Sequence, residues 1–309
     1  MSVLISGSLA YDRILNFNGK FADHILPDKI HSLNVSFFSP EMEESYGGTA
    51  GNISYNLKLL DEAPVILGRG GSDFADYKNW LEKNRIPTES IEIDGNLKTA
   101  VATILTDESN NQIAGFYPGA MLEAYSLPIP DGRFGIVAAG NPEDMKKMPS
   151  VFTERHIPYI YDPAQGIPIL SGEDLKAGII GAEIVISNDY ELSLIKDKTS
   201  WDEAEILKHA KILVTTMGEQ GSRIMTASET IAVSPATADN AEDPTGAGDA
   251  YRAGFIAGYL RELPLKTCGQ LGGIAACYTV ERHGTQTHRF TLPELRERYH
   301  TNFKETLNI

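Results

Sequence analysis

The segment from Asp243 to Phe255, DPTGAGDAYRAGF, carries the strongest chemical signal in the sequence. Its glycines allow a tight backbone turn, and a helix that begins there directs free amide N–H groups and the positive end of its dipole at one point, which suits an anion. Asp249 projects from the first turn toward that point. Its carboxylate, which the dipole is expected to keep ionised, fits a base that deprotonates an attacking hydroxyl in phosphoryl transfer. The alternative is a glycine-rich turn in which Asp249 only stabilises the helix start.

A second glycine cluster, YGGTAGN from Tyr46 to Asn52, is expected to open another helix. A ligand can approach the backbone closely at Gly47 and Gly48, and the Asn52 amide both donates and accepts hydrogen bonds. Asp12, which follows an apolar run, is expected to grip vicinal hydroxyls with both carboxylate oxygens. Together these groups suit a polyol. The alternatives are a tight strand-to-helix turn for the glycines and a surface carboxylate for Asp12.

Two common nucleotide motifs are absent from the sequence. No G-x-x-x-x-G-K-[ST] pattern occurs, and the near match to a dinucleotide fingerprint at residues 68–73 has Asp73 where the third glycine belongs. The hypothesis that the protein is a nicotinamide dehydrogenase rests on that near match alone. The seven histidines show no metal-ligand spacing with Cys, Asp or Glu, so no metal cage built by the protein is expected.

Short apolar runs alternate with amphipathic stretches along most of the chain. This alternation predicts an α/β fold in which helices cover both faces of a mostly parallel sheet. The strands are expected at 3–9, 65–68, 136–139, 157–161, 183–187 and 212–216. The helices are expected at 51–60, after a cap at Ser72, and at 142–154, 173–180 and 201–211.

Two segments, 15–39 and 98–117, break the alternation with β-type runs that have no helix between them. We expect them to form antiparallel strands of a small sheet that covers a cleft at the carboxyl ends of the parallel strands. The chain is thus expected to be a single domain, 1–309, with lid insertions at about 13–45 and 96–118. The exposed edge of such a lid offers a pairing surface for a homodimer.

Composition restricts the class of protein further. The 309 residues are 42% hydrophobic and 22% charged, which is typical of a globular protein, and the net charge of −15 disfavours nucleic acid and anionic lipid as partners. No apolar stretch has the length of a membrane span, and the first residues lack the features of a signal peptide. Cys268 and Cys277 are expected on opposite faces of one helix, without a disulfide. The expected location is the cytoplasm.

The two glycine clusters resemble the two signatures of the ribokinase/PfkB family of carbohydrate and nucleoside kinases, and the resemblance extends over essentially the whole chain. It implies a ribokinase-like fold with a small β-sheet lid. It also implies that Asp249 is the catalytic base. The amides of Gly246, Ala247 and Gly248 would then form the anion hole for the transferred phosphoryl group.

Two further motifs resemble the nucleotide-binding elements of that family. Asn188 to Glu191 resembles its N-x-x-E motif, which organises Mg²⁺ and phosphates through water, although the residues alone indicate a helix-capping pair. Residues 216–221 resemble its T-x-G-x-x-G turn. The implied ATP-binding residues are Asn188, Thr216, Gly218, Gly221, Thr245 and Arg252, with Glu191 acting on the metal through water. Mg²⁺ would arrive with ATP, and Arg252 would either neutralise phosphate charge or form a salt bridge with a nearby carboxylate.

Within the family, the sequence is most similar to bacterial adenosine kinases. The implied substrate-binding residues are Ser8, Asp12, Ser36, Gly47, Gly48, Asn52, Phe116 and Gln165. The Phe116 ring either stacks on a purine base or packs the lid. Two positions depart from that branch: Ala102 replaces an aromatic partner for the base, and Gly166 stands where a second polar side chain would occur.

The favoured hypothesis is an ATP-dependent kinase that phosphorylates the 5′-hydroxyl of adenosine or a related nucleoside. The first alternative is a sugar kinase acting on ribose, fructose or another furanose. The second is a non-catalytic nucleoside or sugar sensor on the same fold.

Overall fold

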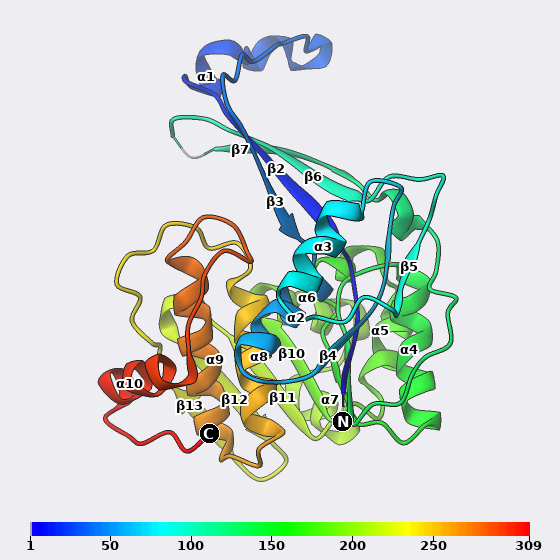
Figure 1. Cartoon of the computed structure of the whole chain (residues 1–309), viewed down its shortest axis with the longest axis vertical. Helices are drawn as coiled ribbons and strands as arrows, with labels where there is room; N and C mark the ends of the chain where they lie inside the picture. Colours follow the sequence, from blue (N-terminus) through cyan, green and yellow to red (C-terminus); the bar gives the residue numbers. More distant parts are fainter. Residues whose placement is uncertain (1, 110) are drawn as a thin grey trace.

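A nine-stranded sheet forms the body of the protein in this computed structural model, which describes residues 2–109 and 111–309 (Figure 1). The strand order is β13-β12-β11-β10-β9-β8-β1-β4-β5. The parallel strands are β1 (Val3–Ser6), β4 (Pro64–Gly70), β5 (Ile91–Ile93), β8 (Phe134–Val137), β9 (Tyr159–Tyr161), β10 (Ile184–Asn188) and β11 (Ile212–Thr216). Two antiparallel strands, β12 (Ser222–Thr226) and β13 (Thr230–Val233), complete one edge. The predicted mostly parallel sheet is confirmed.

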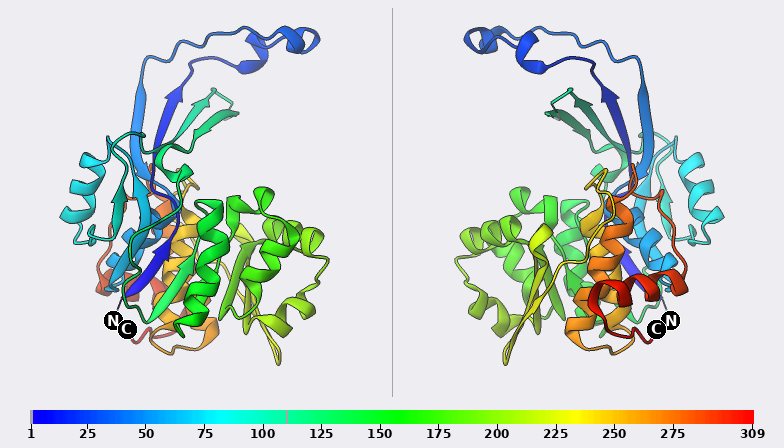
Figure 2. Two further views of the ribbon diagram at one scale, coloured as in Figure 1. Left: turned by 90° about the vertical axis from the view of Figure 1, so that its right-hand side faces the viewer. Right: turned by 90° about the vertical axis from the view of Figure 1, so that its left-hand side faces the viewer.

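Helices cover both faces of this sheet (Figure 2). One face carries α2 (Thr49–Leu59), α3 (Ala75–Lys83), α8 (Ala247–Tyr259), α9 (Leu265–Val280) and α10 (Leu292–Phe303). The other carries α4 (Pro142–Glu154), α5 (Gly172–Ile179), α6 (Asp189–Thr199) and α7 (Glu203–His209). Short helical turns are α1 (Phe21–His24), η1 (Pro27–Ser32), η2 (Gly119–Leu122), η3 (Ala164–Ile169) and η4 (Gly218–Gln220).

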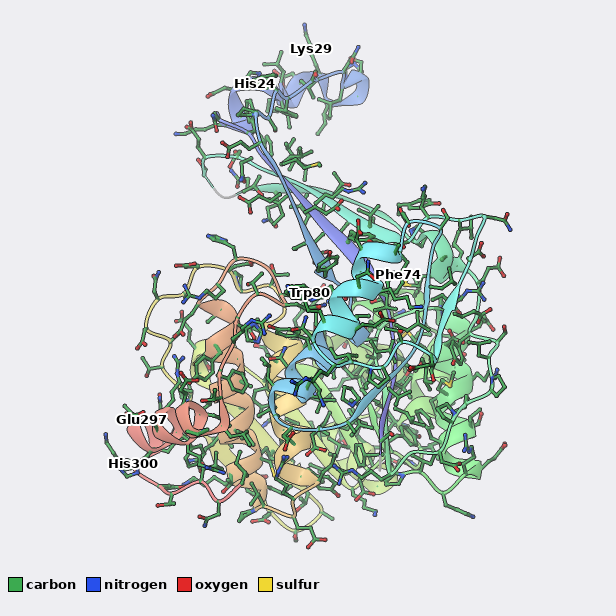
Figure 3. The ribbon with its side chains drawn as sticks, in the orientation of Figure 1. His24, Lys29, Phe74, Trp80, Glu297 and His300 are labelled. Carbon is green, nitrogen blue, oxygen red and sulfur yellow. The ribbon has the colours of Figure 1, made fainter. Side chains whose placement is uncertain are left out.

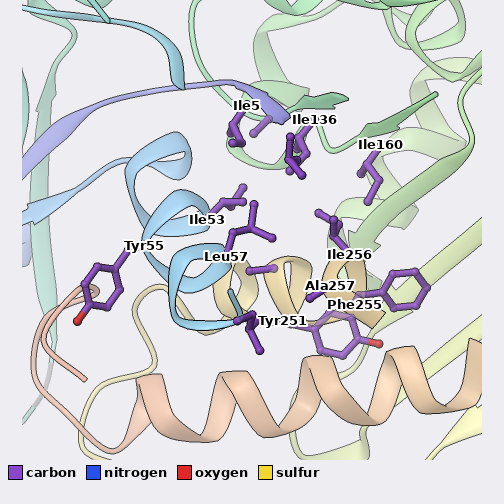
Figure 4. Close-up of a cluster of buried hydrophobic side chains, with 14 of the residues drawn as sticks. Ile5, Ile53, Tyr55, Leu57, Ile136, Ile160, Tyr251, Phe255, Ile256 and Ala257 are labelled. Carbon is purple, nitrogen blue, oxygen red and sulfur yellow. The ribbon is translucent and has the colours of Figure 1, made fainter. Parts of the chain in front are cut away.

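Each face of the sheet has its own hydrophobic core because successive strand side chains point in opposite directions. On β1, Ile5 belongs to the core beneath α2 and α8, whereas Leu4 belongs to the core beneath α4 and α5. Figure 4 shows Ile5 facing Ile53 of α2 and Ile256 of α8. Because both faces are buried, the strands are short continuous apolar runs, which is why the sequence revealed them.

A second sheet projects from the body, with strand order β3-β2-β6-β7 (Figure 1). Its strands are β2 (Ala10–Asn16), β3 (Met42–Gly47), β6 (Ala100–Thr106) and β7 (Gln112–Tyr117). We call this sheet, with the segment that joins β2 to β3, the lid. The prediction of antiparallel strands was wrong for its central pair, because β2 and β6 run parallel. Both strands leave the same carboxyl edge of the main sheet, β2 after β1 and β6 after β5, and so point the same way.

Three other expectations concern the cap of α3, the two cysteines and the length of the apolar helices. Ser72 does not cap α3, which begins at Ala75, because residues 72–74 form a turn in which the Ser72 amide donates to the Leu97 carbonyl. Cys268 and Cys277 both lie on α9, buried and without a disulfide. Among the described residues, no helix is long and apolar enough to cross a membrane.

Candidate active site

The candidate site lies where the parallel strands end beneath the lid. The first turn of α8 reaches this edge, and its Asp249 carboxylate Oδ2 accepts a 2.9 Å hydrogen bond from Nδ2 of Asn52, in the first turn of α2. Asn52 is 5% exposed, and Asp249 is partly buried. The two glycine clusters, almost two hundred residues apart in the chain, therefore meet in the fold.

The start of α8 has the conformation that the glycine pattern requires. Gly246 precedes the helix at φ +79°, in the left-handed region, and a Cβ there would lie 2.9 Å from Cγ2 of Thr285. Asp243 fixes the turn, because its carboxylate accepts from the amides of Thr245 at 2.9 Å and Gly284 at 3.2 Å. Asp249 is consequently held at the third position of the helix.

The amide groups of this turn differ in what they can bind. The N–H of Ala247 already donates to the Pro244 carbonyl at 3.2 Å. Within residues 2–109 and 111–309, the structure shows no acceptor for the N–H groups of Gly246, Gly248 and Asp249, as expected for the start of a helix. Of the three predicted amides, Gly246, Ala247 and Gly248, the structure therefore leaves those of Gly246 and Gly248 available to an anion, and Asp249 adds a further one.

The protonation of Asp249 is set by more than the helix dipole. Burial raises the pKa of its carboxyl, and the Glu191 charge adds to this effect, whereas Arg252 and the Asn52 hydrogen bond lower it. The net direction is upward. The prediction from sequence considered the helix dipole, which favours the ionised form, and did not include desolvation, which acts in the opposite direction.

Arg252 forms a buried ion pair with Asp162, a residue that the sequence analysis missed. Arg252 is 6% exposed and Asp162 is 0% exposed. Nη2 of Arg252 donates to Asp162 Oδ1 at 2.6 Å, and Nε contacts the other carboxylate oxygen. The structure therefore shows the salt-bridge alternative for Arg252. A signal did exist, since Asp162 directly follows strand β9 at the carboxyl edge.

Burial raises the pKa of Asp162 to about 7, although Arg252 acts in the opposite direction. The negative charges of Glu191 and Asp249 raise it further. Three carboxylates thus surround one guanidinium, whose Nη2 lies 3.9 Å from Oε2 of Glu191. The site consequently has an excess of negative charge unless a cation joins it.

Asn188 and Glu191 form the helix-capping pair that the residues alone indicated. The backbone N–H of Asn188 donates to Glu191 Oε2 at 2.8 Å, and the backbone N–H of Glu191 donates to Asn188 Oδ1 at 2.7 Å. The described residues contain no group of three or more His, Cys, Asp or Glu side chains that could hold a metal by themselves. The Mg²⁺ ion expected with ATP, on which Glu191 would act through water, stays a prediction.

Asp12 faces the same region from the lid strand β2. A Cβ at Gly47 would lie 2.2 Å from Asp12 Oδ2, so the glycine leaves room for this carboxylate. Burial raises the pKa of Asp12 to about 6, and the charges of Asp249 and Asp243 contribute. Asp12 therefore lies close enough to Asp249 for the two charges to interact.

Ser8 and Gly48 hold the start of α2. The Ser8 hydroxyl accepts a 3.0 Å hydrogen bond from the Thr49 amide. Gly48 has φ +85°, and a Cβ there would lie 2.6 Å from the Ser8 carbonyl oxygen. Both residues thus have structural roles beside the site. Their contacts with substrate stay a prediction.

Three predicted substrate residues have exposed side chains. Ser36 lies in the lid segment between η1 and β3, Gln165 in η3, and Phe116 is 55% exposed on β7. Phe116 pairs across the lid with Ala102, so the small residue adjoins the ring. A Cβ at Gly166 would lie 2.5 Å from Cε of Met145, so a side chain there requires the flexible end of Met145 to move.

The predicted ATP residues Thr216, Gly218 and Gly221 follow one another at the end of β11. Gly221 has φ +85°, and a Cβ there would lie 2.1 Å from the Val233 carbonyl oxygen. A Cβ at Gly218 would meet no atom within 4 Å, which leaves that side of the turn open. Thr245 is exposed in the loop before α8.

Thr285 and Gln286 also belong to the site, and no sequence pattern indicated them. Gln286 Nε2 donates to Asn52 Oδ1 at 3.1 Å. The Thr285 hydroxyl lies 2.7 Å from the same oxygen and 2.8 Å from the Tyr46 carbonyl, either of which can accept its one proton. Both residues are almost fully buried. They follow α9 in an irregular segment without a motif.

Comparison with known proteins agrees with this geometry. The family model for pfkB family carbohydrate kinases matches residues 18–291. The nucleoside kinase of Methanocaldococcus jannaschii is 31% identical over 276 residues, which cover 88% of this chain and 91% of that protein. Its solved structure has a TM-score of 0.88 and 28% identity, and the match covers 97% of this chain and 98% of that one.

A solved structure of Burkholderia thailandensis nucleoside kinase in complex with inosine is also similar. The TM-score is 0.89 at 33% identity, and the match covers 98% of this chain and 99% of that one. These similarities confirm the ribokinase-like fold. The chain therefore belongs to the pfkB family of carbohydrate kinases and is an ATP-dependent kinase whose acceptor is an alcohol group.

Proposed function

We propose that this kinase transfers the γ-phosphoryl group of MgATP to the 5′-hydroxyl of a nucleoside, with adenosine or a related purine nucleoside as substrate. The observation that carries the proposal is the Asp249 carboxylate, held by Asn52 beside the open amides at the start of α8. Similar proteins support the substrate class: two archaeal relatives are nucleoside kinases, and Burkholderia thailandensis nucleoside kinase is known in complex with inosine and with ADP-inosine.

The proton transfer follows from the hydrogen bonds of Asp249. Because Oδ2 accepts from Asn52, the other oxygen, Oδ1, is the one that takes the proton of the substrate hydroxyl. A raised pKa makes this carboxylate a stronger base once it is ionised. The oxygen of the substrate then attacks the γ-phosphorus, and ADP leaves.

The charge that develops on the transferred group is met by the amides of Gly246, Gly248 and Asp249, at the positive end of α8. Mg²⁺ bound with ATP supplies charge neutralisation and orients the phosphates. Asn188 and Glu191 would hold the water ligands of Mg²⁺. The positive charge of Arg252 partly neutralises the carboxylates that surround this arginine. Thr216, Gly218, Gly221 and Thr245 are proposed to line the remainder of the ATP site.

Substrate recognition is proposed to begin with Asp12, whose carboxylate accepts hydrogen bonds from the ribose hydroxyls. Ser8, Gly47, Gly48 and Gln165 would complete the sugar site, and Ser36 and Phe116 the base site. The Phe116 ring, 55% exposed, offers a stacking face for a purine.

A second candidate function is a sugar kinase. The matching family is one of carbohydrate kinases, and the small Ala102 beside Phe116 leaves the base site without a second aromatic face. Ribose or fructose would then be phosphorylated in place of a nucleoside. A sensor that binds these ligands without turnover would form no ADP with any of them.

We also propose a homodimer formed through the lid. All six residues of β7 are exposed, and β7 lies at the edge of its sheet, where the described residues provide a partner strand, β6, on one side only. Large apolar side chains are exposed along the lid as well: Leu26, Ile30, Leu33, Phe38, Met42 and Ile113. A second copy would cover this apolar surface.

A panel of acceptors tests the proposed function. ADP formation is measured with adenosine, inosine, cytidine, ribose and fructose, for the wild type and for Asp249→Asn. We expect the highest kcat/KM with a purine nucleoside. We also expect about a 10²- to 10⁴-fold loss of kcat in Asp249→Asn, the usual contribution of a general base, with unchanged affinity for ATP. Asp197→Asn, on the exposed face of α6, is the matched control. A near-normal rate in Asp249→Asn would refute the role of the base.

A further inference from the structure

A chain of hydrogen-bonded side chains connects Trp80 on α3 to the catalytic base. The indole Nε1 of Trp80 donates to Gln286 Oε1 at 3.1 Å. Gln286 Nε2 donates to Asn52 Oδ1 at 3.1 Å, and Asn52 Nδ2 donates to Asp249 Oδ2 at 2.9 Å. Gln286 is 2% exposed and Asn52 is 5% exposed, so water does not compete for these groups. Figure 3 shows Trp80 beside the base of the lid.

The direction of this chain follows from the one group that can only donate. An indole N–H has no acceptor capacity, so the oxygen of the Gln286 amide must face Trp80, and its nitrogen must face Asn52. Asn52 then presents its oxygen to Gln286 and its nitrogen to Asp249. The orientation of both amides is therefore determined by their partners.

One hydroxyl group, that of Tyr77, supports the same direction. The Tyr77 hydroxyl donates its proton to the Gly47 carbonyl at 2.8 Å, so its oxygen accepts from Gln286 Nε2 at 2.7 Å. The Thr285 hydroxyl has a single proton and two acceptor oxygens within reach, Asn52 Oδ1 at 2.7 Å and the Tyr46 carbonyl at 2.8 Å, so it does not by itself orient the Asn52 amide. With Oδ1 of Asn52 facing Gln286 Nε2, its Nδ2 is left for Asp249.

We propose that Gln286, oriented by Trp80, is a positioning residue that keeps Asn52 a donor to one oxygen of Asp249 and so leaves the other oxygen free for the substrate hydroxyl. This inference rests on the proposed function. Without Gln286, the Asn52 amide can rotate and bring its oxygen to Asp249. Two acceptors then meet, and the carboxylate binds a proton more tightly.

Other charged groups face Asp249 and remain in place in the test. They are Asp12 of β2, Asp162 after β9, Glu191 of α6 and Arg252 of α8 itself, and the charge of Asp243 in the preceding loop acts on Asp12. Because a Gln286 variant changes none of these charges, a shift in titration reports the lost orientation of Asn52.

The experiment compares Gln286→Leu and Trp80→Phe with the wild type. For Gln286→Leu we expect kcat at pH 7 to fall about 10- to 100-fold, the usual effect of a hydrogen bond to a charged group, with an unchanged KM for MgATP. The acid limb of kcat/KM should move up by about one pH unit. Trp80→Phe keeps a ring but removes the donor, so a smaller shift in the same direction is expected, and it serves if Gln286→Leu does not fold.

A matched control and a second readout complete the test. Gln270→Leu removes another buried glutamine, one that contacts Tyr299 on the far side of α9, and should leave the pH profile unchanged. Carbon-13 NMR of the Asp249 carboxyl, assigned with Asp249→Asn, measures the pKa without substrate. If the wild type phosphorylates no acceptor, the proposed function fails, and the NMR titration still decides the positioning role. An Asp249 pKa and a pH profile that match the wild type in a folded Gln286→Leu or Trp80→Phe would overturn the proposal.

Discussion

Replacement of Arg252 by methionine should destabilise the protein strongly and in a pH-dependent way. The substitution keeps the approximate length of the side chain but removes both contacts with Asp162. Asp162 has no exposed surface, and Asp249 and Glu191 place like charges near it. A buried carboxylate would therefore remain without a counterion.

The magnitude follows from the burial of both partners. Removal of one partner of a buried ion pair costs about 3–5 kcal/mol of unfolding free energy. At roughly 2.1 cal/mol/K per residue, a chain of 309 residues has an unfolding entropy near 0.65 kcal/mol/K, so Tm should fall by about 5–8 °C. The exposed pair of Arg13 and Glu44 is worth at most about 1 kcal/mol, so Arg13→Met should change Tm by less than about 2 °C.

The penalty should depend on the charge of Asp162. Its folded pKa, about 7 with Arg252 present, is higher than the value near 3.9 in an unfolded chain. A carboxyl with a raised pKa stabilises the folded state at low pH, and this contribution is lost as pH rises through the folded pKa. Loss of Arg252 raises the pKa of Asp162 further, so the penalty should be largest above pH 8 and smaller at pH 5.5.

Differential scanning calorimetry at pH 8.5 and pH 5.5 measures these effects. The comparison includes the wild type, Arg252→Met, Arg13→Met and the double variant Arg252→Met/Asp162→Asn, in which the buried charge is gone. The double variant should regain most of the lost Tm at pH 8.5. Equal melting of Arg252→Met and the wild type at pH 8.5, or a double variant no more stable than Arg252→Met, would refute the reasoning.

Two other predictions concern the substrate site and the lid. Because the pKa of Asp12 is about 6, its carboxylate becomes protonated as pH falls below 6, and KM for the nucleoside should rise. Asp12→Asn should raise KM at every pH and abolish this dependence. Steady-state kinetics between pH 5 and 8 check this, and a flat wild-type profile would contradict it. On the lid, Ile113→Lys should convert a dimer into a monomer of 33.8 kDa in multi-angle light scattering, and a wild type that is already monomeric would refute the dimer.

The sequence predicted most of the main sheet because that part of the fold is encoded locally. Strands such as Ile184–Asn188 are apolar on both faces, and Pro142–Glu154 has a capped start with helical spacing. The glycine turns at Gly48 and Gly246 were predicted for a similar reason, since each needs a backbone conformation that other residues adopt at a cost.

The features that sequence reasoning missed depend on distant partners. The role of Asp162 depends on its ion pair with Arg252, ninety residues later. The role of Gln286 depends on its hydrogen bonds with Trp80 and Asn52. The direction of β2 relative to β6 depends on where each strand leaves the main sheet, which no local pattern records. Desolvation of Asp249 likewise becomes visible only when the surrounding elements are in place.

The position of Trp80 gives the protein a built-in optical reporter. Its ring stacks on Tyr46 of the lid strand β3 at a centroid distance of 5.5 Å, while its N–H donates toward Gln286. Its emission should therefore respond both to movement of the lid and to rearrangement near the base. Trp201, the other tryptophan in the sequence, stacks on His209 away from the lid, so a Trp201→Phe background would isolate the signal from the site.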